Sequence, residues 1–107
     1  PGVNPLGHSG LYRHNYCYFP VFIEEEFGTS RDELYEYMVN NDILVRRYFY
    51  PLVSHASCYR HLPSANPQLL PNATKISNQV LCLPLYTALE VEKVDMICDM
   101  IQKARKK

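Results

Sequence analysis

The sequence of 107 residues contains no tryptophan, only four glycines and no excess of charge of either sign. Its 11 basic and 11 acidic residues cancel, so the chain lacks the positive surface with which proteins hold a nucleic-acid backbone. None of the glycines builds a phosphate-binding loop such as G-x-G-x-x-G, and no apolar stretch reaches the roughly 20 residues of a membrane-spanning helix. These absences argue against a nucleic-acid partner, a membrane span and a glycine-rich nucleotide loop.

Cysteine spacing and the start of the chain bear on its compartment. The four cysteines lack the close spacing of a disulfide framework, and no charged-apolar-small signal peptide opens the sequence. We therefore expect a cytoplasmic protein. The first residue is Pro1 rather than Met, which indicates a fragment or a processed chain.

The remaining composition is that of one folded domain. Hydrophobic residues make up 47% of the chain and charged residues 21%, and the length leaves no room for a second core. The chain has nine tyrosines and no tryptophan. Tyrosine is common on surfaces where an aromatic ring also needs a hydrogen-bonding hydroxyl, such as interfaces and the walls of ligand sites.

Local signals divide the first half of the chain. Residues 1–14 are rich in Pro, Gly, Asn and His and predict an extended lead-in or linker. The aromatic and β-branched run 16–23 predicts a strand, and Pro20 within it indicates an edge strand or a bulge. Ser30-x-x-Glu33 forms a capping box that starts a helix, which we expect to end at Asn40–Asn41 in the left-handed conformation.

The second half gives two further strands and two further helices. Residues 42–49 predict a strand that begins buried, and a long connection follows from 51 to about 71. A short helix at 72–78, a strand at 80–83 and a final helix capped by Thr87-x-x-Glu90 complete the pattern. The order predicts an α+β fold over residues 15–107, with a small antiparallel sheet of about three strands covered on one face by helices.

The tightest group of ligand-type residues is His55-x-x-Cys58-x-x-His61. Imidazole and thiolate suit zinc, but structural zinc sites use two separated pairs and no fourth ligand is evident. Cys58 could act as a nucleophile with either histidine as base, yet nothing in the sequence orients such a base. We therefore expect a solvent-facing loop, no metal site and no catalytic residue in this chain.

The stretch 42–52, D-I-L-V-R-R-Y-F-Y-P-L, places charge and aromatic rings directly after an apolar run. If it is a strand, Arg46, Tyr48 and Tyr50 share one face, and Arg47 and Phe49 share the other. An arginine with two phenols suits a phosphate or a sugar hydroxyl. Inward packing of Phe49 with solvated arginines explains the same pattern equally well.

Three segments together resemble the C-terminal end of the DegT/DnrJ/EryC1/StrS family of sugar aminotransferases. They read N-Y-C-Y-F-P-V-F at 15–22, R-R-Y-F-Y-P-L at 46–52 and L-P-N-A-T-K-I-S-N-Q-V-L-C-L-P-L-Y at 70–86. The resemblance implies the small domain of a pyridoxal-phosphate-dependent enzyme that aminates a nucleotide-linked keto-sugar. By the same resemblance, the parent enzyme is a homodimer, and the large domain supplies the Schiff-base lysine and most cofactor contacts. This chain alone should then be inactive and bind no cofactor.

The resemblance also implies substrate contacts. Arg46, Tyr48 and Pro51 fall on the family's Arg, aromatic and Pro positions, and we expect Arg46, Tyr48, Tyr50 and His55 to border the nucleotide-sugar pocket. Many family members carry His directly after Pro-Leu, where this chain has Val53, so His55 would have to replace it. The alternative that remains open is a stand-alone ferredoxin-like ligand-binding module.

Overall fold

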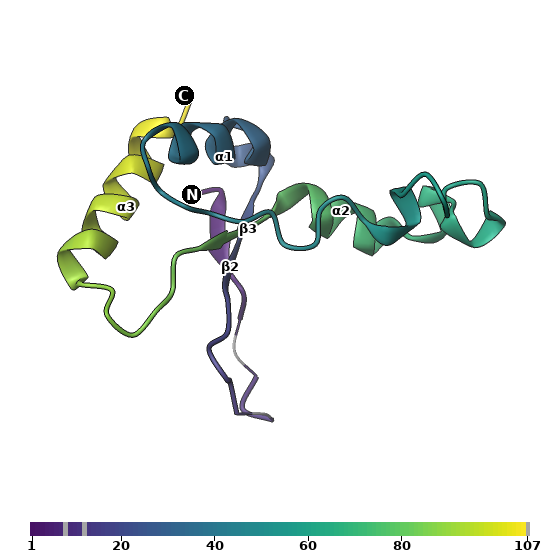
Figure 1. Cartoon of the computed structure of the whole chain (residues 1–107). Helices are drawn as coiled ribbons and strands as arrows, with labels where there is room; N and C mark the ends of the chain where they lie inside the picture. Colours follow the sequence, from purple (N-terminus) through teal and green to yellow (C-terminus); the bar gives the residue numbers. More distant parts are fainter. Residues whose placement is uncertain (8, 12, 107) are drawn as a thin grey trace.

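A three-stranded antiparallel sheet lies at the centre of the molecule (Figure 1). The computed structural model describes residues 1–7, 9–11 and 13–106. In the order in which they pair, the strands are β1 (Val3–Pro5), β2 (Phe19–Ile23) and β3 (Val80–Leu83). Strand β1 lies in the segment expected to be an extended lead-in, and all three of its residues pair with β2.

Helices α1 (Arg31–Asn40) and α3 (Val91–Ala104) pack on one face of the sheet, and α2 (Pro71–Gln79) leads into β3. Alternate strand residues Val21, Ile23 and Leu81 form the core together with Leu34 of α1 and Ile97 of α3. The predicted α+β fold is therefore confirmed. None of the helices that the described residues form is long and apolar enough to span a membrane.

Pro20 lies in the central strand, so the predicted edge position is wrong. It stands opposite Cys82 of β3, whose own N–H and C=O bond with Arg46 on the other side. The missing N–H of Pro20 faces the β1 side, where β1 has already ended at Pro5, and the Pro20 carbonyl there accepts from Leu6 N at 3.3 Å. The bond that Pro20 cannot donate therefore falls beyond the last paired residue of β1, and a proline is tolerated at such a position.

The predicted capping box at the start of α1 is confirmed. Ser30 Oγ accepts from Glu33 N at 3.2 Å, and Glu33 Oε2 accepts from Ser30 N at 2.9 Å. Lys106 Nζ donates to Glu33 Oε1 at 2.7 Å, and Thr29 Oγ1 donates to Ala104 O at 2.6 Å. The Lys106 hydrogen bond, followed by those from Ser30, lowers the pKa of Glu33 from 4.5 to about 2. The last turn of α3 is thus tied to the first turn of α1.

The second predicted capping box does not form. Helix α3 begins at Val91, and the N-cap residue is Glu90, whose side chain makes no capping hydrogen bond. The predicted left-handed end of α1 also lies one residue further on. Asp42 has φ 61°, whereas Asn41 has φ −107°.

The predicted strand 42–49 is reduced to a single bridge, in which Arg46 N donates to Cys82 O at 3.1 Å and Cys82 N to Arg46 O at 2.8 Å. Two features stop the pairing on either side. If the pairing of the two segments continued toward the end of β3, the next partner would be Pro84, which has no N–H to donate. In the other direction the pairing meets the Val80 carbonyl, which accepts from Arg31 Nη1 at 2.9 Å instead. The chain then turns at Tyr48–Phe49, where Phe49 has φ 47°.

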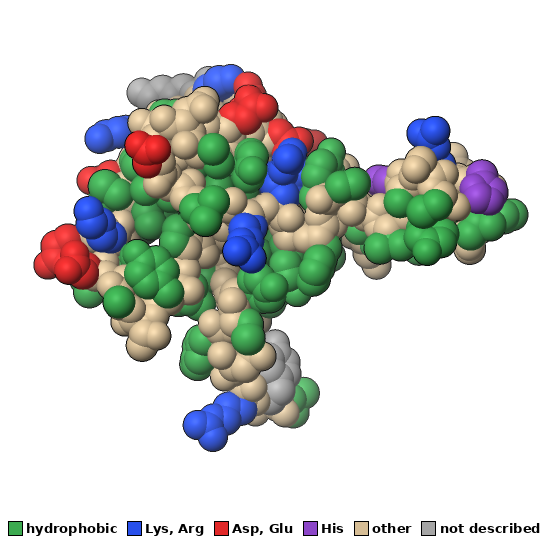
Figure 2. Space-filling view, viewed as in Figure 1, with side chains coloured by type: hydrophobic (Ala, Val, Ile, Leu, Met, Phe, Trp, Pro, Cys, Tyr) green, Lys and Arg blue, Asp and Glu red, His purple; other side chains and the backbone are tan. Residues whose placement is uncertain are grey.

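Residues 51–70 form an arm that projects from the body of the molecule (Figure 1). Its only regular pieces are three single turns of 3₁₀ helix, η2 (Val53–His55), η3 (Pro63–Ala65) and η4 (Pro67–Leu69). Apolar side chains cover much of its surface (Figure 2). The radius of gyration is 15.5 Å, above the roughly 13 Å of a compact domain of this length. The molecule is therefore a compact body from which two segments extend, the arm and the described residues between β1 and β2 (Figure 1).

Candidate functional site

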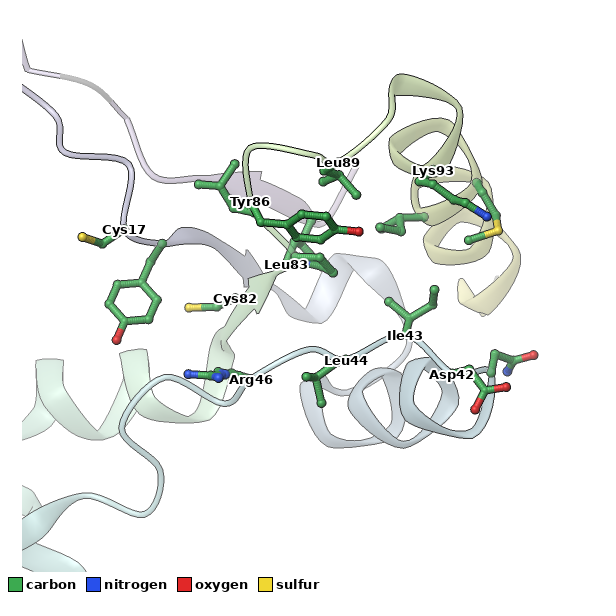
Figure 3. Close-up of a pocket in the computed structure, with 16 residues that line it drawn as sticks. Cys17, Asp42, Ile43, Leu44, Arg46, Cys82, Leu83, Tyr86, Leu89 and Lys93 are labelled. Atoms are coloured by element: carbon green, nitrogen blue, oxygen red, sulfur yellow. The ribbon is translucent and has the colours of Figure 1, made fainter.

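A hollow of about 720 Å³ opens at the edge of the sheet, beside the Arg46–Cys82 bridge. Its apolar part comes from the end of β3, the loop that follows it, helix α3 and the segment after α1, and includes Leu44, Leu83 and Tyr86. Arg46 and Lys93 contribute the two cations of the lining (Figure 3). The volume lies within the range of small-molecule sites, and few polar groups surround an apolar floor, as is usual for such sites.

Arg46 reaches the hollow because its backbone is held by the bridge to Cys82. Its guanidinium forms no ion pair with any carboxylate of the described residues. Burial raises the pKa of the Cys82 thiol, and the positive charge of Arg46 only partly opposes this. Cys82 is therefore a neutral wall of the hollow rather than a nucleophile. Arg46 and Lys93 are lining cations that no carboxylate of the described residues pairs with.

A row of three aromatic rings continues from the hollow along the outside of the body. Tyr18, at the rim, lies 5.0 Å from the Tyr48 ring between centroids, and Tyr48 lies 4.4 Å from Phe49. Tyr18 and Phe49 are exposed, and Tyr48 is half-buried between them. Arg46 and Tyr48, both expected from the sequence, are thus linked through Tyr18, which lines the hollow with Arg46 and contacts Tyr48.

Tyr50 does not share this surface, so the predicted alternation of faces is wrong. Its ring lies against Arg31 and Arg47, with guanidinium-to-centroid distances of 4.7 and 4.9 Å. The turn at Tyr48–Phe49 explains the change, because a left-handed residue breaks the two-residue period of a strand. Tyr50 therefore lies with Arg47 rather than with Arg46.

His55 lies on the arm, in turn η2, and does not line the hollow. Cys58 and His61 follow on the same exposed arm. Among residues 1–7, 9–11 and 13–106, no group of three or more His, Cys, Asp or Glu side chains is placed to hold a metal ion. His55 therefore lies outside the hollow, and its contact with substrate stays a prediction.

Sequence reasoning missed Tyr18, Tyr86, Lys93 and Asp42 as lining residues. Tyr18 carried a weak signal, because it belongs to an aromatic run that was assigned only to a strand. Tyr86 and Lys93 are at least 40 positions from Arg46 in the sequence, and only the packing of α3 beside the sheet brings them to one hollow. No local pattern predicts that meeting.

Comparison with known proteins gives a family match over almost the whole chain. The sequence model of the DegT/DnrJ/EryC1/StrS aminotransferase family matches residues 3–102. A dTDP-4-amino-4,6-dideoxy-D-glucose transaminase from Escherichia coli is 47% identical over 101 residues, which cover 94% of this chain and 27% of that relative. The enzyme of the same name from Shigella dysenteriae is 34% identical over 104 residues, 97% of this chain and 28% of the relative. A GDP-perosamine synthase from Vibrio cholerae is 32% identical over 90 residues, 83% of this chain and 23% of the relative. The chain spans about a quarter of the length of these relatives.

Proposed function

The chain belongs to the DegT/DnrJ/EryC1/StrS aminotransferase family, and we propose that it is the small C-terminal domain of an enzyme that transfers an amino group from an amino acid to a nucleotide-linked keto-sugar. The observation that carries the proposal is the match over residues 3–102, which includes the sheet, the hollow and the aromatic row. Three relatives are named for amino-sugar nucleotides. A stand-alone ferredoxin-like module is not favoured, because it leaves this match unexplained.

Enzymes of this family use pyridoxal phosphate, which carries the amino group between donor and acceptor. The four lysines that the structure describes do not fit the Schiff-base role, which needs a partly desolvated amine. Lys75, Lys93, Lys103 and Lys106 are all exposed, and Lys106 is paired with Glu33. We therefore propose that the cofactor and the catalytic lysine belong to a large domain outside these 107 residues, and that this chain alone is inactive.

In this proposal, Arg46 and the aromatic row border the nucleotide-sugar site. A guanidinium that no carboxylate of the described residues pairs with suits the diphosphate, and the phenols of Tyr18 and Tyr48 suit sugar hydroxyls. His55 remains a predicted contact that would meet the substrate only if the arm docks against the rest of the enzyme. In this proposal Tyr50 acts through its contacts with Arg47 and Arg31.

A homodimeric, cytoplasmic parent is part of the same proposal. The family resemblance supports the dimer, and the cysteines support a reducing compartment because Cys17, Cys58, Cys82 and Cys98 are all free thiols. Light scattering of the parent polypeptide tests the first point, and a monomer at micromolar concentration would contradict it.

A chimera tests the function. This chain replaces the matching quarter of the E. coli relative, and transaminase activity is followed on that relative's own substrate. We expect an active chimera in which Arg46→Ala lowers kcat/KM by about 10- to 100-fold, the range for a lost charged hydrogen bond. Arg105→Ala, at an exposed position beyond α3, is the matched control and should leave kcat/KM unchanged.

Two outcomes would contradict different parts of the proposal. A folded chimera that binds pyridoxal phosphate but has no transaminase activity argues against the function. Full activity of the Arg46→Ala chimera argues against the site while leaving the function in place.

A further inference from the structure

Arg31 is a buried charge that the sequence analysis did not single out. It is the first residue of α1 and is 2% exposed. Its Nη1 donates to two carbonyls, Ser77 O at 2.8 Å and Val80 O at 2.9 Å, and its Nε donates to Asp32 Oδ1 at 2.9 Å. A guanidinium can hold such a set of acceptors because its donors form a rigid planar fork. Arg31 thus links the start of α1 to the junction between α2 and β3.

Arg47 joins the same group through Asp32. Its Nη1 donates to Asp32 Oδ1 at 3.2 Å, so one carboxylate oxygen serves both arginines. Its guanidinium also lies over the Tyr35 ring, 4.5 Å from the centroid. The Tyr50 ring is therefore in contact with two guanidiniums that are both anchored on α1.

The Tyr50 ring stabilises positive charge that the hydrogen bonds of Arg31 and Arg47 do not fully neutralise. Arg31 Nη2 is buried and has no hydrogen-bond partner among the described residues, and two arginines share a single carboxylate. The negative face of an aromatic ring stabilises a nearby cation, and more strongly where water is excluded. A leucine at position 50 would fill part of the space but would remove this stabilisation.

We propose that Tyr50 is a positioning residue, held by Arg31 and Arg47, which fixes the path of residues 46–50. Arg31 occupies the Val80 carbonyl, so strand pairing stops after Arg46, and the contacts of Tyr50 fix the turn that follows. Arg46 then faces the hollow while Tyr48 lies on Tyr18. We call the contacts of Tyr50 with Arg31 and Arg47 the clamp. The clamp is a property of this chain, whereas its effect on substrate binding rests on the function proposed above.

Trypsin tests the clamp on the 107-residue chain under native conditions. Cleavage after Arg46 and Arg47 reports opening of residues 46–50, and cleavage after Arg60 reports the arm. We expect Tyr50→Leu to speed cleavage at Arg46 and Arg47 by about 10-fold, as expected from losing two cation–π contacts. Tyr50→Phe keeps the ring and should match the parent chain. Tyr59→Leu on the exposed arm is the matched control and should not change cleavage at Arg46 or Arg47.

Side-chain chemical shifts measured by nuclear magnetic resonance test the same contacts independently. A general loss of stability would not change them in the same way. The ring current of Tyr50 should shift the side-chain resonances of Arg31 and Arg47, and we expect Tyr50→Phe to keep these shifts while Tyr50→Leu removes them. If Tyr50→Leu does not fold, Arg47→Lys, which keeps the charge but loses the planar fork, should raise cleavage at the two sites. The proposal is overturned if neither Tyr50→Leu nor Arg47→Lys changes the cleavage rate at positions 46 and 47 or the arginine side-chain chemical shifts.

The chimera separates a positioning residue from a substrate ligand. If the Tyr50 hydroxyl binds substrate, Tyr50→Phe raises KM. If Tyr50 only positions Arg46, Tyr50→Phe leaves kcat and KM unchanged and Tyr50→Leu lowers kcat/KM. A raised KM in Tyr50→Phe overturns the proposal, and an inactive parent chimera refutes the function while the trypsin and resonance results still decide on the clamp.

Discussion

The body and the arm of this molecule differ in where their contacts lie. In the body, side chains from α1, the sheet and α3 meet in one core, so residues far apart in the sequence stabilise one another. In the arm, the backbone hydrogen bonds join residues three or four positions apart, as from Tyr59 N to Ala56 O, and large apolar side chains such as Leu69 stay exposed. The body therefore has the contacts for cooperative folding, whereas the arm depends mainly on local turns.

The largest expected contrast comes from equal truncations in the two regions. Leu34, fully buried in α1, and Leu69, 66% exposed in the arm, lose the same atoms when changed to alanine. We expect Leu34→Ala to reduce the free energy of unfolding by about 2–5 kcal/mol, and Leu69→Ala to change it by less than about 0.5 kcal/mol. Urea unfolding followed by circular dichroism measures both. Equal losses would mean that the arm belongs to the same cooperative unit as the body.

A smaller contrast is expected between two glycines. Gly28 has φ 79°, and a Cβ there would lie 2.3 Å from Lys106 O, whereas a Cβ on Gly10 would meet no atom within 4 Å. Gly28→Ala therefore strains the backbone and separates the end of α3 from α1, at a cost of about 1–3 kcal/mol. Gly10→Ala should be nearly neutral. Thermal unfolding of the two variants tests this, and an unchanged melting temperature for Gly28→Ala would show that the contact with Lys106 yields easily.

The smallest effect is expected from pH. The pKa of Glu33 is lowered to about 2 in the folded chain, so folding favours its ionised form. Its contribution to stability is present above pH 4.5 and is lost as pH falls through about 2. Glu33 is fully exposed, so the effect should be small and should weaken with added salt.

The comparison is between the parent chain and Glu33→Gln, in urea unfolding at pH 6 and pH 2.5. The difference between the two proteins should shrink at the lower pH. A difference that is the same at both values would contradict the assigned pair with Lys106.

Features that depend on neighbouring residues could be predicted from the sequence. The capping box of Ser30 and Glu33, the strand 80–83 and the helix after Leu70 each follow from a short pattern, and the structure contains all three. Arg46 was identified from the residue types around it, and it does line a hollow.

Features that depend on distant residues could not be predicted. The strand 42–49 fails because Arg31 takes the Val80 carbonyl, a bond that joins positions 49 residues apart. The left-handed turn at Tyr48–Phe49 then takes Tyr50 away from Arg46. Similarly, β1 exists only through its pairing with β2, since its own sequence V-N-P has no strand pattern. Local propensity gives no information on which remote group occupies a given carbonyl.

The two ends of the described chain meet at one place, beside Phe27 and Gly28. A Cβ on Gly2 would lie 2.3 Å from Phe27 N, and one on Gly28 would lie 2.3 Å from Lys106 O. Both ends of the described chain therefore lie next to residues 27–28. A short peptide could join the ends, and new termini could be opened in the arm, giving a circular permutant in which the order of elements changes while the core contacts stay the same.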